Sequence, residues 1–228
     1  MKDFVIHPEI GKVTINRSKR AKRLSVTVRN TETILTIPPR IKYDIAYGFL
    51  DDKAAWILSV KKKYKRDNQI ILPIKTRCYE LISTQCIAGE EPCTVSGKTI
   101  CIFLSQNIES DPSQEIIKKV LDDVYYQEAK VLLPGRVNLL AEKYGFDFNK
   151  LSFRRSYTRW GSCSGKNNIS LSSRLMKLPD RLIDYVILHE LCHTVHKNHG
   201  KDFHELLDKV TYGNHRSLNS ELRKFSTR

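Results

Sequence analysis

The sequence contains no long apolar segment. None of its hydrophobic runs approaches the roughly 20 consecutive residues that a membrane-spanning helix requires. The first residues, Met1 to Val5, lack the apolar core and the small-residue cleavage site of a signal peptide. We therefore expect a cytoplasmic protein with no membrane partner. Its 40% apolar and 28% charged residues are typical of a globular chain, and 228 residues suffice for one domain or two small ones.

Closely paired cysteines are also missing. Four of the six cysteines recur every seven or eight residues through one region, without the C-x-x-C pairs of a structural zinc site: Cys78, Cys86, Cys93 and Cys101. A cytoplasmic address argues for free thiols. The spacing therefore favours separate thiols over a four-cysteine metal site, and Cys192 is expected to pack.

Acidic residues are few relative to basic ones. The chain has 39 Lys and Arg against 25 Asp and Glu, a net charge of +14. Its densest basic clusters are Arg17–Arg23 and Lys61–Arg66. Such clusters favour polyanions such as nucleic acid, acidic proteins or nucleotides, and the alternative is a solvated basic surface. Neither cluster matches a named nucleic-acid-binding motif, and no internal repeat or low-complexity segment is visible.

The first hundred residues show strand patterns around one helix. Residues 24–29 and 33–37 alternate apolar and polar side chains, with a turn expected at 30–32. A helix is expected from Tyr43 to Lys65, with an apolar stripe of Ile45, Phe49, Trp56, Ile57, Val60 and Tyr64. Short strands are expected at 70–72, 79–82, 93–95 and 99–103. We predict a β-rich N-terminal module over residues 1–107.

The remaining residues, 108–228, show a different pattern. Asp111 is the expected N-cap of a long helix, with Pro112 at its first position and Gln114 completing a capping box. This helix should end at Gly145, and Pro134-Gly135 should kink or split it. Strands are expected at 151–156 and 168–171, a buried helix at 180–197 and another helix at 201–210. The fold class predicted is α+β.

The buried helix carries the motif His189-Glu190-Leu191-Cys192-His193. Histidines at i and i+4 share one face of a helix and can bind the same cation. The glutamate between them lies about 100° around the helix, within reach of a metal-bound water. This is the H-E-x-x-H pattern of zinc hydrolases, so we expect one Zn²⁺ per chain and Glu190 as the general base.

A catalytic zinc site needs a third protein ligand and an open position for water. The candidates are His196, His199, His204 and Glu205. His196 would lie roughly 10.5 Å along the axis from His189, which fits a tetrahedral site poorly. His199 is preferred, because Asn198 and Gly200 are residue types that end a helix and reverse the chain. The spacing also matches the third histidine of H-E-x-x-H-x-x-G-x-x-H peptidases, although His196 replaces the glycine.

Further roles remain open at the sequence level. His196 could orient Glu190 or a ligand, or lie at the pocket rim. His204 and Glu205, on the helix at 201–210, could be partners that fix a histidine tautomer, or simply polar surface. Three more side chains could stabilise a developing oxyanion or could pack, and none is assigned as catalytic: Tyr157, Arg159 and Tyr212.

Several segments together resemble a known family. They are R-W-G-S-C-S at Arg159–Ser164, N-I-S-L at Asn168–Leu171, and the histidine motif from Asp184 to His199. Three N-terminal segments add to them: the basic segment K-R-x-K-R-L-S-V-x-V at 19–28, I-P-P-R at 37–40 and A-A-W-I at 54–57. Together these segments resemble the YgjP-like metal-dependent hydrolases, which are relatives of the WLM and SprT-like zincin metallopeptidases. The resemblance implies a minimal zincin-like domain with an active-site helix, a backing helix and a small sheet. It implies His189, His193 and His199 as ligands and Glu190 as base.

The resemblance also bears on substrate. In zincins an edge strand commonly holds an extended peptide, and Asn168–Leu171 is the strand we expect to do so. We therefore expect a zinc-dependent metallopeptidase in which Glu190 assists attack by a metal-bound water. One alternative is a metal-dependent nucleotide pyrophosphatase or phosphohydrolase, with lysines and arginines holding phosphates. The other is a basic nucleic-acid-associated protein with a residual metal site. The expected partners are accordingly a peptide, protein or nucleotide substrate, with nucleic acid on the basic clusters.

Overall fold

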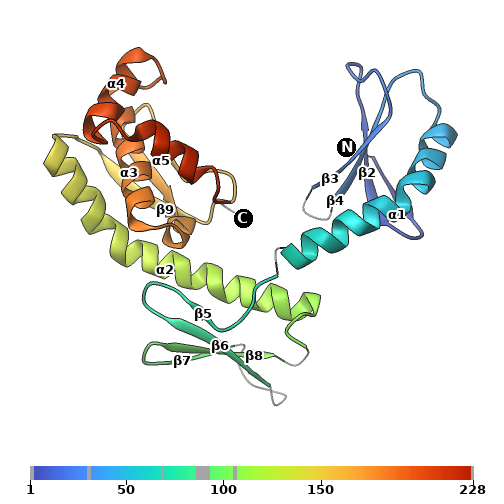
Figure 1. Cartoon of the computed structure of the whole chain (residues 1–228), viewed down its shortest axis with the longest axis horizontal. Coiled ribbons are helices and arrows are strands. Elements are labelled where there is room, and N and C mark those ends of the chain that lie inside the picture. Colours follow the sequence, from blue (N-terminus) through green and yellow to red (C-terminus); the bar gives the residue numbers. More distant parts are fainter. Residues whose placement is uncertain (1–2, 30–31, 68, 86–92, 105–106, 227–228) are drawn as a thin grey trace. The chain divides into compact units, whose positions relative to one another are not determined.

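The computed structural model describes residues 3–29, 32–67, 69–85, 93–104 and 107–226 (Figure 1). It divides into two units, Met1–Gln69 and Ile70–Arg228. Helices combine with small sheets in both, so the α+β class is confirmed. Within the described residues, no helix is both long enough and apolar enough to cross a membrane.

The first unit is a four-stranded sheet covered by one helix. Its strands are β1 (Phe4–His7), β2 (Gly11–Arg17), β3 (Ser25–Arg29) and β4 (Glu32–Ile37), and its helix is α1 (Tyr43–Asp67). The sheet order is β1-β2-β4-β3, with β2 and β4 parallel. Alternate residues of β2 and β4 face α1, and the core consists of Ile10, Val13, Ile15, Leu35, Ile37, Ala46, Leu50, Ala54 and Ile57.

The apolar stripe of α1 differs from the predicted one. Ile57 is fully buried as expected, but Ile45 is 60% exposed and Trp56 is 48% exposed. Ala46 and Leu50 face the core instead. Alanine side chains are small and allow the helix to approach the sheet closely. The face of α1 that carries Ala46 and Leu50 therefore packs on the sheet, although it is less hydrophobic than the adjacent face that carries Ile45 and Trp56. The turn predicted at residues 30–32 lies largely outside the described residues.

The second unit begins with a sheet of the same topology. Its strands are β5 (Ile74–Lys75), β6 (Glu80–Gln85), β7 (Cys93–Ser96) and β8 (Thr99–Leu104), in the order β5-β6-β8-β7. As in the first sheet, the two inner strands are parallel and both outer pairs are antiparallel. Each sheet is followed by a long helix, here α2 (Asp111–Tyr144). This structural repeat does not correspond to a visible repeat in the sequence, because the alternation of side chains in a strand does not specify strand order.

The second sheet therefore belongs with α2 and not with the first unit. Leu81, Ile102 and Leu104 share one core with Ile117 and Val124 of α2. The sequence-based division at residues 107 and 108 thus falls inside the second unit, whereas the structural division falls between Gln69 and Ile70. The change from strand patterns to a helix pattern near residue 107 marks the passage from the second sheet to α2. The sheet and α2 lie in one unit because they bury their apolar faces against each other.

The start of α2 is capped differently from the prediction. The N-cap is Ser110, whose hydroxyl accepts a hydrogen bond from the Ser113 amide at 3.3 Å. The Gln114 side chain instead bonds both backbone groups of Ile70, at 2.7 Å and 3.1 Å. Residues 70–72 accordingly form no strand, contrary to the prediction. α2 also runs unbroken through Pro134 and ends at Gly145, which adopts the left-handed conformation with φ 71°.

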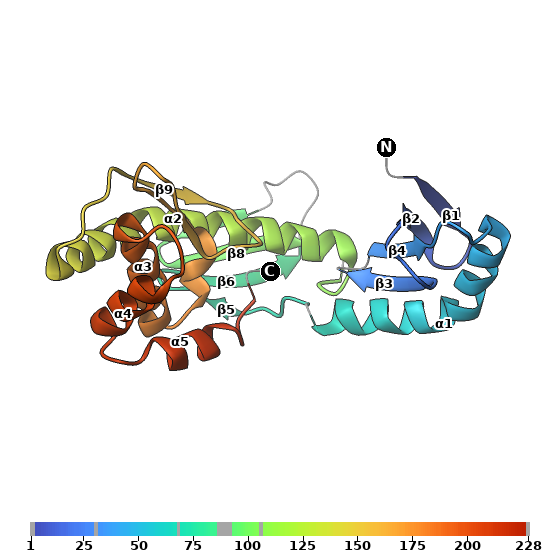
Figure 2. The same ribbon diagram turned by 90° about the horizontal axis from the view of Figure 1, so that it is seen from above.

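The C-terminal elements build a small three-stranded sheet and three α-helices. The strands are β9 (Lys150–Arg154), β10 (Gly161–Cys163) and β11 (Asn168–Ser172), followed by the 3₁₀ helix η1 (Ser173–Lys177). The helices are α3 (Asp180–Val195), α4 (Lys201–Val210) and α5 (His215–Leu222). Figure 2 shows β8 and α3 beside successive parts of α2, the backing helix of the predicted zincin-like domain.

The sheet order β10-β11-β9 corrects one prediction. β11, expected at the edge, lies in the centre, paired antiparallel with β10 and parallel with β9. The edge strand next to α3 is β10, which comes from the R-W-G-S-C-S segment. β11 is the more apolar strand and is buried on both sides, whereas short β10 has no sequence pattern that distinguishes it from a loop.

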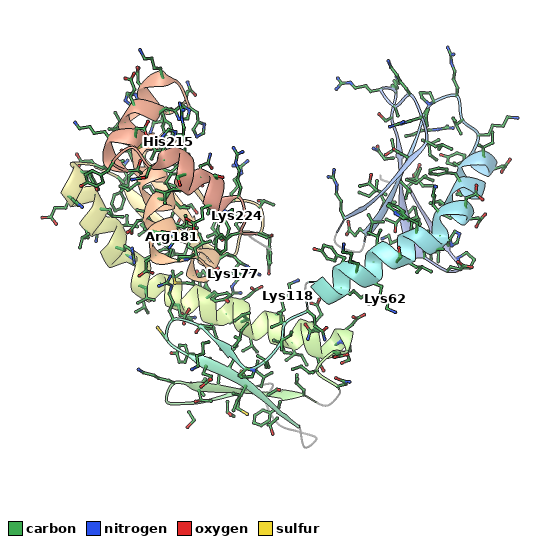
Figure 3. All side chains as sticks on the ribbon, in the orientation of Figure 1. Lys62, Lys118, Lys177, Arg181, His215 and Lys224 are labelled. Carbon is green, nitrogen blue, oxygen red and sulfur yellow. The ribbon has the colours of Figure 1, made fainter. Side chains whose placement is uncertain are left out.

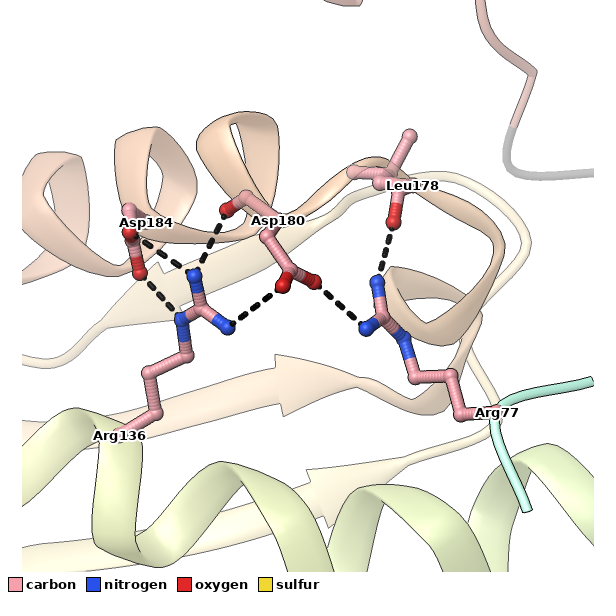
Figure 4. A network of polar contacts seen from close by, with 5 residues as sticks. All are labelled: Arg77, Arg136, Leu178, Asp180 and Asp184. Atoms are coloured by element: carbon pink, nitrogen blue, oxygen red, sulfur yellow. Dashed lines mark hydrogen bonds and ion pairs between the residues drawn. The ribbon is translucent and has the colours of Figure 1, made fainter.

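An ionic network fixes the start of α3 against the rest of the unit (Figure 4). Arg136 of α2 bonds both carboxylate oxygens of Asp184 and lies 3.5 Å from Asp180. Arg77 donates to the Asp180 carboxylate at 2.5 Å and to the Leu178 carbonyl at 2.6 Å. These contacts lower the pKa of Asp180, with the hydrogen bond from Arg77 as the main cause. α2 and the β5–β6 turn thus hold the helix that carries the histidine motif.

The described cysteines are free thiols, as expected: Cys78, Cys93, Cys101, Cys163 and Cys192. Cys192 is fully buried, which agrees with its predicted packing role. Cys86 lies outside the described residues, so the four-cysteine arrangement is not tested.

Candidate metal centre and active site

The two motif histidines occupy adjacent turns of α3. Leu188, Leu191 and Cys192 are buried, whereas His189 and His193 are only partly buried and lie on one open face. Their ring centroids are 4.9 Å apart. The helix ends at Val195, and His196 follows in extended conformation with φ −115°. The chain therefore turns away from the helix axis soon after the second histidine.

His199 returns to this face after the turn. Its Nε2 lies 3.1 Å from Nε2 of His193 and 3.1 Å from Nε2 of His189. Ligand atoms of the three residues all lie within 4.8 Å of one another. Three nitrogens at about 2.1 Å from a tetrahedral zinc ion would be about 3.4 Å apart. The observed donor set therefore fits a zinc ion, and the arrangement is the one predicted for His189, His193 and His199.

Two features prepare these rings to bind a cation. His193 donates from Nδ1 to the His196 carbonyl at 3.0 Å, which leaves Nε2 with a free lone pair. Burial, aided by His193, His199 and His204, lowers the pKa of His189 to about 4. His189 is therefore neutral near pH 7, as a ligand must be. His196 contributes to this geometry through its backbone carbonyl.

A phenylalanine supports all three rings. Phe203 of α4 is fully buried, and its ring centroid lies 5.0, 4.5 and 4.7 Å from those of His189, His193 and His199. Its contact with His193 is stacked, and the other two are edge contacts. Sequence reasoning did not single out Phe203. The available signal was the spacing of Phe203, Leu207 and Val210 along one face of the helix predicted at 201–210.

Glu190 follows His189 directly, about 100° around α3, and lies against the edge strand β10. It is 6% exposed, and burial raises the pKa of its carboxyl group to about 7, with Arg159 opposing the rise. Gly161 of β10 is in close contact with it. A Cβ atom at position 161 would lie 2.7 Å from both Cγ and Oε1 of Glu190. Only glycine lets the strand backbone approach the carboxylate this closely.

The other predicted site residues lie farther from the three nitrogens. The His204 ring is 6.4 Å from that of His199 and 5.5 Å from that of His215. Glu205 is an exposed residue 3.6 Å from Lys201. Within the described residues, neither His204 nor Glu205 hydrogen-bonds to one of the three converging histidines.

His204 and Glu205 instead line a separate cavity of about 450 Å³ between α4 and α5. His215, at the start of α5 and labelled in Figure 3, also lines this cavity with Asp208, and its Nδ1 lies 2.6 Å from an Asp208 carboxylate oxygen. This cavity is lined in addition by Lys201 and Arg216.

Of the three side chains considered for oxyanion stabilisation, two are engaged elsewhere. Tyr157 hydrogen-bonds to Asp122, and the guanidinium of Arg174 lies 4.3 Å from its ring centroid. Tyr212 is 3.4 Å from the hydroxyl of Tyr144. Arg159 is exposed, and its charge acts on Glu190.

One comparison with known proteins identifies the family of this chain. The family model of the YgjP-like metallopeptidase domain matches residues 22–225. A search of curated proteins finds no match. Among solved structures, the chain is similar to the metallopeptidase zymogen of Methanocaldococcus jannaschii jannalysin, with 22% identity and a TM-score of 0.34 over 39% of this chain and 90% of that chain. The family match spans most of the sequence and includes every residue of the histidine cluster, so the chain belongs to the YgjP-like metallopeptidase family.

Proposed function

We propose that this metallopeptidase-family protein is a zinc-dependent peptidase with Glu190 as its general base. One observation carries the proposal: Nε2 of His199 lies 3.1 Å from Nε2 of both His189 and His193, and the glutamate next to His189 is buried. His189, His193 and His199 would hold the ion. When bound, a zinc ion supplies Lewis acidity that polarises oxygen ligands and makes water more acidic.

The protein side chains perform the proton transfers in this proposal. Glu190 accepts a proton from the attacking water and delivers it to the departing amine. Its burial favours the neutral carboxyl group, so it binds that proton readily near pH 7. The His196 carbonyl keeps the His193 ring in one tautomer throughout.

The edge strand β10 supplies a surface for an extended peptide. The Ser172 amide donates to the Trp160 carbonyl, and the Ser164 amide donates to the Asn168 carbonyl. Backbone groups alternate in direction along an antiparallel strand, so those of Gly161 and Cys163 point away from β11. A substrate strand could pair with these groups. Because Gly161 touches Glu190, the scissile bond of such a peptide would pass close to the base.

A nucleotide pyrophosphatase remains the second candidate, and nearby cations favour it. The charge of Arg159 acts on Glu190. Lys197 hydrogen-bonds to Asn167 in the turn that joins β10 to β11. Both side chains are exposed, so they could contact phosphate groups at the same centre.

Substitution of the base tests both candidates. We expect Glu190→Gln to abolish cleavage of a diverse peptide library while zinc content stays at one ion per chain. Glu205→Gln is the matched control, since this exposed glutamate lies outside the cluster. Peptide cleavage that is unchanged in Glu190→Gln would refute the proposal. Metal-dependent phosphate release from nucleoside triphosphates, lost in Glu190→Gln without any peptide cleavage, would establish the second candidate instead.

The ligand assignment has its own test. His199→Ala should reduce zinc content measured by mass spectrometry, because it removes one of the three converging nitrogens. His196→Ala should retain zinc, because His196 bonds His193 through its backbone carbonyl, which alanine keeps. Loss of zinc from His196→Ala with retention in His199→Ala would reverse the assignment of the third ligand.

A further inference from the structure

The positive charge of the protein is concentrated in its first unit. Residues 1–69 contain 16 Lys and Arg and 7 Asp and Glu, a net charge of +9, whereas residues 70–228 contain 23 and 18, a net charge of +5. No acidic residue occurs between positions 10 and 31. The N-terminal unit therefore carries most of the excess charge in fewer than a third of the residues.

The fold brings many of these cations to one edge of the unit. The Arg17 guanidinium donates to the Ile41 carbonyl at 3.0 Å, and the Ser18 amide donates to the Ile37 carbonyl at 3.1 Å. The loop that follows β2 therefore lies against the loop that joins β4 to α1. The last residue of β2 and six basic residues of these two loops, all exposed, form what we call the basic edge: Arg17, Lys19, Arg20, Lys22, Arg23, Arg40 and Lys42.

Aromatic side chains lie at the same edge. Tyr43 and Tyr47, in the first turns of α1, are stacked with ring centroids 6.1 Å apart. Arg17 lies over the Tyr43 ring at 4.8 Å, which orients its guanidinium. Both tyrosines are more than a third exposed, at 37% and 36%. The positive end of the α1 dipole adds to the potential of the basic edge.

We propose that the basic edge binds nucleic acid through its sugar-phosphate backbone, without sequence specificity. Four of its seven cations are arginines, whose planar guanidinium groups match phosphate oxygens. Exposed rings among cations suit nucleic acid, which offers both phosphates and stackable bases. This binding function is additional to the proposed peptidase activity and uses none of the residues assigned to the metal centre.

Salt dependence gives the first test. Five phosphate contacts on single-stranded DNA would reduce the association constant by about 10²-fold between 50 and 200 mM salt, because each contact releases condensed counterions. We expect fluorescence anisotropy of labelled single-stranded and duplex DNA with the full-length protein to follow this dependence. No binding at 50 mM salt would overturn the proposal. Equal or tighter binding to heparin or to vesicles of 30% phosphatidylserine would also overturn it, because the partner would then be a different polyanion.

Substitutions then locate the site. A triple variant with Lys19→Gln, Arg20→Gln and Arg23→Gln removes three exposed charges from the basic edge. We expect it to weaken DNA binding at 50 mM salt at least tenfold, and to reduce the slope of log affinity against log salt by about 2 to 3. Zinc content and circular dichroism should match the unsubstituted protein, since none of the three side chains is in the core.

A charge-matched control separates position from total charge. Lys53→Gln, Lys62→Gln and Lys63→Gln remove the same three charges from α1, outside the basic edge, where Lys62 projects from the C-terminal part of the helix (Figure 3). We expect this control to bind DNA within threefold of the unsubstituted protein. Equal losses in the two triple variants would refute a localised site and leave only a general effect of net charge.

Discussion

The close contact between Gly161 and Glu190 predicts a large effect from adding one methyl group. In Gly161→Ala, the new Cβ would lie 2.7 Å from Cγ and Oε1 of Glu190 and 2.9 Å from Cδ. Carbon atoms at van der Waals contact are about 3.5–4.0 Å apart. Relief of the overlap therefore requires the carboxylate or the strand to move by about 1 Å. Glu190 is buried, which restricts where its carboxylate can go.

A displacement of this size should act mainly on the chemical step. Misplacement of a catalytic group by about 1 Å costs about 10²-fold in rate, or about 2.7 kcal/mol of activation free energy. We therefore expect kcat of Gly161→Ala on a peptide substrate to fall by about two orders of magnitude. The three heavy atoms nearest to the new Cβ all belong to Glu190 and none to a histidine, so zinc content should stay the same.

Gly165→Ala is the matched control. A Cβ at position 165 would meet no atom within 4 Å, and this glycine does not adopt a positive φ. It follows the same strand by two residues, so its substitution should leave kcat within about twofold. The reasoning would be refuted if Gly161→Ala retained kcat within threefold with full zinc content. It would equally be refuted if both variants lost activity to the same extent.

Three further predictions concern stability. Asp122→Ala should lower the free energy of unfolding in urea by about 3–5 kcal/mol, because it leaves the buried guanidinium of Arg174 without its carboxylate partner. The lowered pKa of Asp180 means that its bond to Arg77 stabilises the fold fully above pH 3.8, its ordinary value, and is lost at lower pH. Asp180→Asn should therefore flatten the decline of unfolding free energy below about pH 4, and an unchanged slope would contradict this. Phe203→Ala should cost about 3–5 kcal/mol in the same urea assay and weaken zinc affinity in a chelator competition, since the ring supports all three histidines.

Features that depend on residues close together in the sequence were predicted correctly. The helix predicted at 201–210 forms over Lys201–Val210, and the histidine helix begins at Asp180 as expected. Side chains three or four residues apart meet on any helix, so the spacing of His189 and His193 suffices to place both on one face. The return of His199 was predictable because its neighbours, Asn198 and Gly200, are residue types that end helices.

Predictions that depended on distant contacts were less successful. Asp111 is a suitable N-cap by type, yet Ser110 takes that position, and Gln114 bonds Ile70 from 44 residues away. The resemblance to zincins led us to expect the substrate-binding edge strand at residues 168–171, whereas short β10 occupies the edge next to α3. Strand order depends on which apolar faces are buried together, and alternation within one strand does not record this.

The sequence by itself determined the chemistry of the candidate site: the three imidazoles, the glutamate between two of them, and the helix that presents them. Helical periodicity is a local property, which is why these features were accessible without coordinates. The tertiary structure alone decided what surrounds them. It places Phe203 beneath the rings, Gly161 against Glu190 and the basic residues of two loops at one edge. Each of these contacts joins residues from separate elements, and only the packing of those elements brings them together.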